Sequence, residues 1–235
     1  MSKVVIIFRW LVIVMATSWL TGCASLPENS TADPRDPFER YNRAMFTFNK
    51  TVDDKVLKPV ATGYVAAVPS LIRTAIGNFF GNIGDVWTAV NNYLQGKPRD
   101  GTSDIARVVL NSTFGIAGLI DVATPAGLTK HEEDFGQTLG VWGVKSGSYL
   151  VLPIFGSSTV RDGLARPIDL YLDPINSIES VRVENSARAL RLVDDRAALL
   201  DSLRLFEDAA LDQYQFSRDA YLQRREARIR DGQSD

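Results

Sequence analysis

The chain has 235 residues, 26 of them basic and 28 acidic, and a formal net charge of −2. Its basic residues are dispersed, which excludes the concentrated basic face typical of a nucleic-acid-binding protein or a polybasic membrane patch. One cysteine excludes an intramolecular disulfide, so packing must stabilise the folded part. The length suits one domain with a sizeable core behind a short N-terminal signal.

Residues 1–22 predict an export signal. Lys3 and Arg9 supply positive charge, residues 10–19 are almost entirely apolar, and small residues follow. Ten apolar residues are too few to cross a bilayer core, which needs about 20. The alternative is an uncleaved membrane anchor that uses the earlier apolar residues as well, but Arg9 interrupts that longer run.

Cys23 closes the sequence Leu-Thr-Gly-Cys, which resembles the lipobox of bacterial lipoproteins. The resemblance implies that the signal is removed before Cys23, which then carries a diacylglyceryl thioether and an N-acyl chain. Each buried methylene contributes about 0.8 kcal/mol, so several acyl chains would anchor the protein firmly. The alternative is an incidental buried thiol. Ala24 follows where such lipoproteins carry an aspartate for inner-membrane retention, which implies sorting to the outer membrane.

The acylated cysteine and a flexible tether occupy residues 23–35, because residues 24–35 are polar and offer little to bury. A helical domain is predicted over residues 36–230. Asp36 can cap its first helix, with Pro37 in the first turn and Glu39 three residues beyond the cap. Apolar residues spaced three or four apart predict that this helix runs over 37–57 and that Pro59 ends it.

Three more helices are predicted over 69–80, 85–95 and 103–111, with glycines near their ends. The glycine pair in residues 81–84 is interpreted as a turn between the first two. Both of these helices carry broader apolar faces than a core stripe needs. Such helices are either enclosed by protein or in contact with lipid, and the sequence leaves both open.

The pattern loosens between residues 115 and 173, where a short strand or hairpin is predicted near 148–152. Helical spacing returns over 184–200. Residues 202–230 carry mixed charges and are predicted to form a solvated helical tail, and residues 231–235 close the chain. No apolar run outside the signal reaches the roughly 18 to 20 residues of a spanning helix, so we expect the domain to lie on or within one leaflet or in solution.

Catalytic signatures are scarce. His131 is the only histidine, and it lacks the second histidine of a zinc-protease helix. The acidic residues beside it could bind a metal, but their sequence favours a solvated polar loop. Neither a Gly-x-Ser-x-Gly elbow nor a Walker loop occurs. We therefore expect no enzymatic activity, no metal and no cofactor.

Several sequence blocks, in consistent order, resemble the MlaA (VacJ) family of outer-membrane lipoproteins. The earlier blocks are Asp-Pro-Phe-Glu-Arg-Tyr-Asn-Arg-Ala-Met-Phe at 36–46, Asn-Phe-Phe-Gly-Asn-Ile at 78–83 and Val-Asn-Asn-Tyr-Leu-Gln-Gly at 90–96. The later ones lie at 110–113, 118–123, 134–140, 152–162 and 218–224.

This resemblance implies a mainly helical, ring-like single domain of amphipathic helices in the inner leaflet of the outer membrane, with few or no strands. It implies maintenance of lipid asymmetry, in which phospholipids leave the outer leaflet through an amphipathic channel and pass to a periplasmic carrier, MlaC. Trimeric porins are the implied membrane partners. Nucleic acid is not an expected partner. The alternatives are an enzyme acting on lipid or cell wall, and a structural lipoprotein that organises porins without transport.

We predict that polar residues of the first helix and a glycine-rich stretch at 140–147 contribute to the channel or its gate. The candidates are Asn42, Thr47, Asn49, Gly140, Gly143 and Gly147. The alternative for Asn42 and Asn49 is that they satisfy backbone groups at helix contacts.

Overall fold

The structure is a computed structural model that describes residues 33–202 and 210–231. The predicted export signal, Cys23 and most of the tether lie outside the described residues. The chain divides into two units, residues 1–33 and 34–235, and every helix and strand named here belongs to the second unit.

Its first helical stretch is longer than predicted. Helix α2, Glu39–Val52, continues through a π-helical turn, η1, Asp53–Leu57, into α3, Lys58–Ala67. The prediction that Pro59 ends this helix is wrong. In η1 the Lys58 N–H donates to the carbonyl of Asp53, five residues back, and Pro59 falls in the first turn of α3. This shift in register accommodates the N–H that proline lacks.

Helix α4, Ser70–Leu94, is also continuous, so the predicted turn at residues 81–84 is wrong. Its glycines admit neighbouring side chains close to the helix. A Cβ built on Gly77 would lie 3.2 Å from Asp194 Oδ2, and one on Gly81 would lie 3.3 Å from Lys130 Nζ. The chain reverses at Gly96, which has the positive φ of 77° that glycine tolerates, and α5, Pro98–Thr113, packs back along α4.

The remaining elements are a small antiparallel hairpin, four helices and a 3-10 turn among the described residues. Strands β1, Tyr149–Leu152, and β2, Gly156–Thr159, pair with Tyr149 opposite Thr159, which confirms the hairpin predicted near 148–152. The other helical elements are α6, Phe135–Val141; α7, Val160–Tyr171; the 3-10 turn η2, Pro174–Ser177; α8, Val181–Ala198; and α10, Gln213–Arg230.

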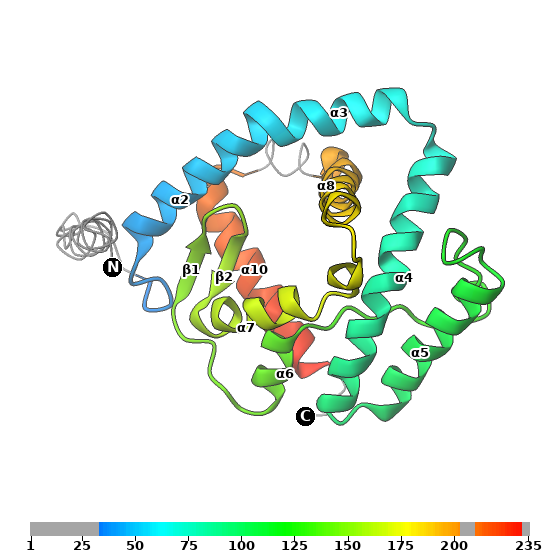
Figure 1. The fold of residues 1–235 in the computed structure, drawn as a ribbon. Helices are drawn as coiled ribbons and strands as arrows, with labels where there is room; N and C mark the ends of the chain where they lie inside the picture. Colours follow the sequence, from blue (N-terminus) through cyan, green and yellow to red (C-terminus); the bar gives the residue numbers. More distant parts are fainter. Residues whose placement is uncertain (1–32, 203–209, 232–235) are drawn as a thin grey trace, which may run out of the picture. The chain divides into compact units, whose positions relative to one another are not determined.

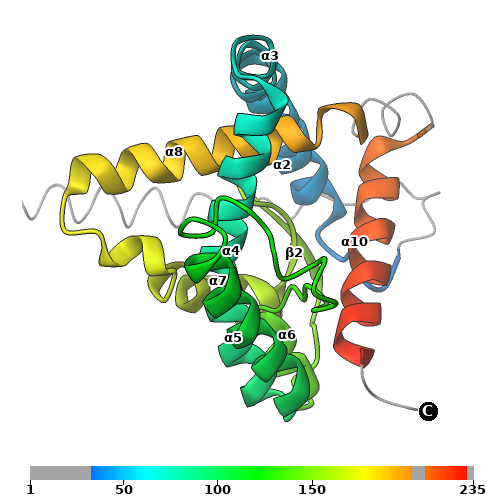
Figure 2. The same ribbon diagram turned by 90° about the vertical axis from the view of Figure 1, so that its right-hand side faces the viewer.

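Within this unit the elements form a ring-like circuit (Figure 1). Helix α2 packs on β1, the hairpin packs on α7, α7 on α6, and α6 on α4, which follows α3. Helix α8 contacts α3 and α4 from inside the circuit and is seen along its length in Figure 2. The prediction of a mainly helical fold with few strands is confirmed.

The prediction of a solvated C-terminal tail is wrong for α10. This helix packs on α6 and β2 (Figure 2). Tyr214 is 3% exposed and joins Tyr149 and Val151 in the apolar cluster beside the hairpin. Arg218 is buried against Asp36, with 3.3 Å between Nη1 and Oδ2. Charged residues of α10 therefore bind to other elements of the circuit, and the helix is not a tail in solvent.

Across the described ranges, no helix is both long enough and apolar enough to cross a membrane.

Candidate functional site

The interior of the described unit is polar. Among the described residues, buried polar and charged side chains outnumber buried apolar ones, and several of the apolar ones are alanine. Arg107, Asn42, Asn91 and Asp104 are each at most 1% exposed. An ordinary globular protein places few such groups inside, because each one must find a hydrogen-bond partner.

Arg107 of α5 organises the space between α4 and α5. Its Nε lies 3.3 Å from Asp85 Oδ2, its Nη2 lies 3.1 Å from Asp121 Oδ2, and its Nη1 donates to the Leu128 carbonyl at 2.7 Å. Burial alone would raise the pKa of Asp121. Hydrogen bonds from Thr124 and Arg107 outweigh burial and hold the pKa of Asp121 well below its usual range.

A second set of polar contacts involves His131, for which the sequence suggested either a metal site or a solvated loop. His131 Nδ1 lies 2.9 Å from Asp104 Oδ1, and Asn92 donates to the other oxygen of Asp104 at 2.7 Å. No cluster that could hold a metal occurs among residues 33–202 and 210–231. The side chain of His131 is only 19% exposed, so within the irregular segment before α6 it turns toward the polar interior.

Arg225 of α10 bridges two carboxylates from different parts of the circuit. Its Nη2 lies 2.6 Å from Asp134 Oδ1, before α6, and 3.0 Å from Asp162 Oδ1 of α7. Burial would raise the pKa of both aspartates, but Arg225 outweighs it and lowers the pKa of each. The hydroxyl of Tyr221 donates to Asp162 at 2.8 Å.

Three cavities open beside these polar clusters. The largest has a volume of about 450 Å³ and lies against α4, the segment 130–134, α7 and η2. The second, of about 210 Å³, shares Asp134, Arg166, Asp169 and Arg228 with it. The third, of about 320 Å³, shares Gly77. The first cavity thus adjoins each of the other two, and charged side chains line all three.

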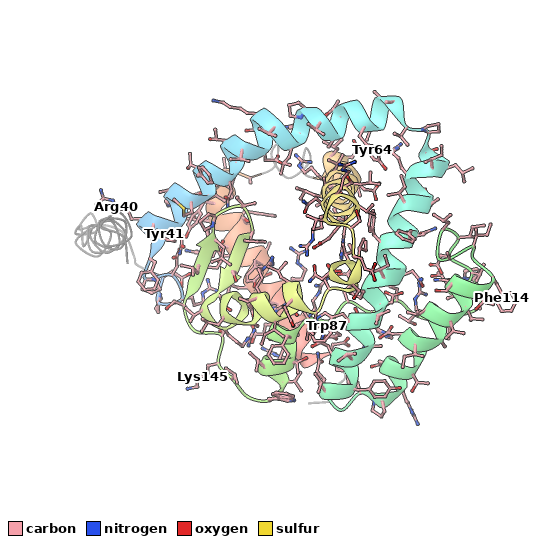
Figure 3. The ribbon with its side chains drawn as sticks, in the orientation of Figure 1. Arg40, Tyr41, Tyr64, Trp87, Phe114 and Lys145 are labelled. Carbon is pink, nitrogen blue, oxygen red and sulfur yellow. The ribbon has the colours of Figure 1, made fainter. Side chains whose placement is uncertain are left out.

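Asp169 of α7 lies where the first two cavities meet. Its Oδ1 accepts hydrogen bonds of 2.8 Å from Trp87 Nε1 and from the Phe135 backbone N–H. Burial raises the pKa of Asp169 above its usual value. In Figure 3, Trp87 and Tyr64 point into the circuit, whereas Phe114 lies on its outer side.

The sequence-predicted residues Asn42 and Asn49 both hold the hairpin. Asn42 accepts from the Val151 N–H at 2.8 Å and donates to the Tyr149 carbonyl at 3.1 Å. Asn49 accepts from the Ile154 N–H at 2.7 Å and donates to the Leu152 carbonyl at 2.9 Å. These contacts have the geometry of the alternative, in which both amides satisfy backbone groups. A gating role for them stays a prediction.

The other predicted residues do not gather with them. Thr47 is exposed and donates to the Arg43 carbonyl within its own helix at 2.9 Å. Gly140 leaves room for neighbours, because a Cβ there would lie 2.7 Å from Ile229 Cδ1. Gly143 and Gly147 have positive φ values of 88° and 68° after α6. None of the six predicted residues lines the cavities described above.

Large apolar side chains lie on the exposed surface instead. Of the exposed large apolar side chains in residues 33–202 and 210–231, only Leu170 lines one of the three cavities. The surface therefore has the character expected of contact with lipid or an apolar partner, while the interior stays polar. The most exposed of them include Leu71, Phe114, Ile116, Ile154, Leu164, Tyr171 and Val181.

Sequence reasoning missed Arg166 and Asp169. They are three residues apart on α7 and so share one helix face. The sequence feature that could have identified them is a pair of opposite charges three residues apart, next to the apolar residues Leu164, Ile168 and Leu170. Their position beside Trp87 of α4 could not be read from spacing within α7.

Comparison with known proteins gives a consistent result. The model of the family described as MlaA lipoprotein matches residues 34–228. Two proteins named "Intermembrane phospholipid transport system lipoprotein MlaA", from Shigella flexneri and Escherichia coli K12, are each 37% identical over 216 residues, which cover 90% of this chain and 85% of theirs. A Rickettsia bellii protein described as uncharacterized is 36% identical over 203 residues, 86% of this chain and 79% of its own.

A solved structure reported as "Structural basis for maintenance of bacterial outer membrane lipid asymmetry" is also similar. It matches with a TM-score of 0.72 and 36% sequence identity, covering 83% of this chain and 98% of the other.

Proposed function

Because this chain belongs to the MlaA lipoprotein family, we propose that it maintains outer-membrane lipid asymmetry by removing phospholipids from the outer leaflet. The resemblance inferred from the sequence blocks is confirmed by the match over residues 34–228. The family is one of transport lipoproteins, and the activity proposed for this chain is transport without covalent chemistry.

The observation that carries this proposal is the separation of polar and apolar surfaces. A phospholipid that changes leaflet must take a charged headgroup past hydrocarbon, which is costly unless a polar path accompanies it. The adjoining cavities, bordered by Asp85, Lys130 and Arg166, supply polar groups for the headgroup. The exposed apolar side chains supply a surface compatible with acyl chains.

The proposal includes the membrane arrangement. Cys23 carries the acyl chains, residues 24–35 form the tether, and the helical unit lies in the inner leaflet with access to the periplasm. Support comes from the lipobox-like sequence and from the family's description as lipoproteins. The periplasmic carrier MlaC receives the lipid, and trimeric porins hold the protein in the membrane. The family resemblance supports these two partners.

The first test measures phospholipid in the outer leaflet of cells lacking the gene, complemented with wild type or with Cys23→Ala. We expect surface phospholipid to accumulate without the protein and wild type to reverse this better than Cys23→Ala. An unchanged outer leaflet in the deletion strain would contradict the transport function.

A cavity-filling variant separates transport from a porin scaffold. Gly84 lines the largest cavity, and a Cβ there would lie no closer than 3.9 Å to Arg191 Nη2, so Gly84→Leu adds a side chain to the cavity without an immediate clash. Gly63 lies in α3, exposed, with nothing within 4 Å of its Cβ position, and Gly63→Leu is the matched control. If the protein transports lipid through this cavity, Gly84→Leu should lose lipid removal and keep porin association, whereas Gly63→Leu should keep both. Full activity of Gly84→Leu would favour the scaffold.

A further inference from the structure

The cationic residues around the largest cavity differ in how they are paired. Lys130 contacts Asp85, Arg191 lies 2.9 Å from Asp173, and Arg228 lies 2.5 Å from Glu132. Arg166 forms no ion pair with any described residue. Its guanidinium instead lies 5.0 Å from the ring centroid of Phe155, in the turn between β1 and β2. This cation–π contact holds the charge in place without neutralising it.

Asp169 complements Arg166 on the same face of α7. Both hydrogen bonds that Asp169 accepts end on Oδ1, and Oδ2 has no hydrogen bond from any described residue. Arg166 and Asp169 interact electrostatically across the cavity margin, but their charged groups do not meet as an ion pair. One cation and one anion therefore lie on the same face of α7. Among the described residues, the guanidinium has no anionic partner and Oδ2 of the carboxylate has no donor.

Both residues line the first and the second of these cavities. The pair therefore stands, with Asp134 and Arg228, where these two cavities adjoin. Guanidinium groups bind phosphate oxygens through parallel charge-assisted hydrogen bonds, and a carboxylate oxygen accepts them from an ammonium group.

We propose that Arg166 and Asp169 form a headgroup site for zwitterionic aminophospholipids, in which Arg166 binds the phosphate and Asp169 binds the ammonium. This inference rests on the proposed transport of phospholipids and adds a selectivity to it. An anionic lipid with an uncharged alcohol beyond its phosphate would use Arg166 alone. Asp169 is thus a specificity residue rather than a general binding residue.

Substitutions of matching size test the two roles separately. Arg166→Gln removes the charge and keeps much of the aliphatic stem. Asp169→Asn keeps the oxygen that accepts from Trp87 and Phe135 and removes only the charge. Arg40→Gln and Asp54→Asn, at exposed positions of α2 and η1 away from the cavities, are the matched controls.

The measurement is binding of dioctanoyl phosphatidylethanolamine and dioctanoyl phosphatidylglycerol to the full chain in mild detergent, with inorganic phosphate and phosphoethanolamine as water-soluble probes. We expect Arg166→Gln to weaken both lipids roughly tenfold or more, as for loss of a charged hydrogen bond. We expect Asp169→Asn to weaken phosphatidylethanolamine by a similar factor and to leave phosphatidylglycerol within about twofold. Arg166→Lys, which keeps the charge, should restore part of the affinity for both lipids.

Several outcomes would overturn the site. These are wild-type affinity in both variants, an equal loss for both lipids in Asp169→Asn, or binding of inorganic phosphate as tight as binding of either lipid. Thermal unfolding of each variant identifies misfolded protein, and Arg166→Lys then tests the charge in a folded chain. If wild type clears the outer leaflet of cells while Asp169→Asn shows no change in lipid preference, the site fails and the transport function stands. If wild type clears no lipid, the transport function itself fails.

Discussion

Arg225 and Asp134 join the last helix to the segment that begins α6, with 2.6 Å between Nη2 and Oδ1. The side chain of Arg225 is 11% exposed and that of Asp134 is 35% exposed. Arg225 also reaches Asp162, so one guanidinium connects α10 with two other elements of the circuit.

Loss of this guanidinium should destabilise the protein. Arg225→Gln leaves Asp162, which is 6% exposed, as a buried charge with a weakened set of partners. Removal of one member of a buried pair costs about 3–5 kcal/mol, and partial exposure of Asp134 favours the lower end, about 3 kcal/mol. Denaturant unfolding in detergent measures the change. The neighbouring Arg224→Gln, at an exposed residue that forms no ion pair with the described residues, should change the free energy of unfolding by less than about 0.5 kcal/mol. Equal effects of the two variants would contradict this role of Arg225.

Asn42 should matter for stability far more than Thr47. Asn42→Ala removes the acceptor of the Val151 N–H, a hydrogen bond of 2.8 Å, and leaves that buried N–H without a partner. An unsatisfied buried group costs about 1–3 kcal/mol. Thr47→Ala removes an exposed bond within its own helix and should be nearly neutral. The gate hypothesis makes a different prediction, namely altered lipid distribution at unchanged abundance. Protein level and outer-leaflet phospholipid, measured together for both variants, distinguish the two roles of Asn42.

Acid should destabilise the fold through Asp121. The pKa of this carboxyl is lower in the folded protein than its unfolded value of about 3.9. Its ionised form therefore stabilises the fold at every pH above about 4, and this stabilisation is lost as the pH falls toward the folded-state pKa. Unfolding of Asp121→Asn, measured from pH 7 to pH 3, should show a shallower loss of stability than wild type. Asp54→Asn, at an exposed carboxylate, should keep the wild-type slope.

Two glycines should respond to alanine with opposite signs. A Cβ on Gly101 of α5 would lie 2.9 Å from the ring of Tyr93 and 3.1 Å from the Ala89 carbonyl, so Gly101→Ala must separate α4 from α5. Gly63→Ala meets nothing within 4 Å in the helix α3 and should stabilise by about 0.5–1 kcal/mol through lower unfolded-state entropy. Melting temperatures of the two variants check both signs. A destabilised Gly63→Ala, or a Gly101→Ala as stable as wild type, would contradict this packing.

Sequence patterns predicted local structure where the cause was local. Helical spacing identified most of the residues in α2, α4, α5 and α8, and Gly96 marked the end of α4. The failures at Pro59 and at residues 81–84 have different physical causes. The π turn before Pro59 supplies a hydrogen-bond register that propensity does not describe, and the glycines of α4 serve approaching side chains rather than a turn.

The sequence by itself determined the lipobox-like Cys23, the mainly helical class and the family, because these depend on residue types in linear order. Only the tertiary structure decided that α10 belongs to the circuit and that Arg166 and Asp169 border two cavities. Long-range ion pairs such as Arg225–Asp134 and hydrogen bonds such as Trp87–Asp169 join residues that are far apart in the chain. Their partners are fixed by packing, and periodicity within one element carries no information about what another element brings beside it.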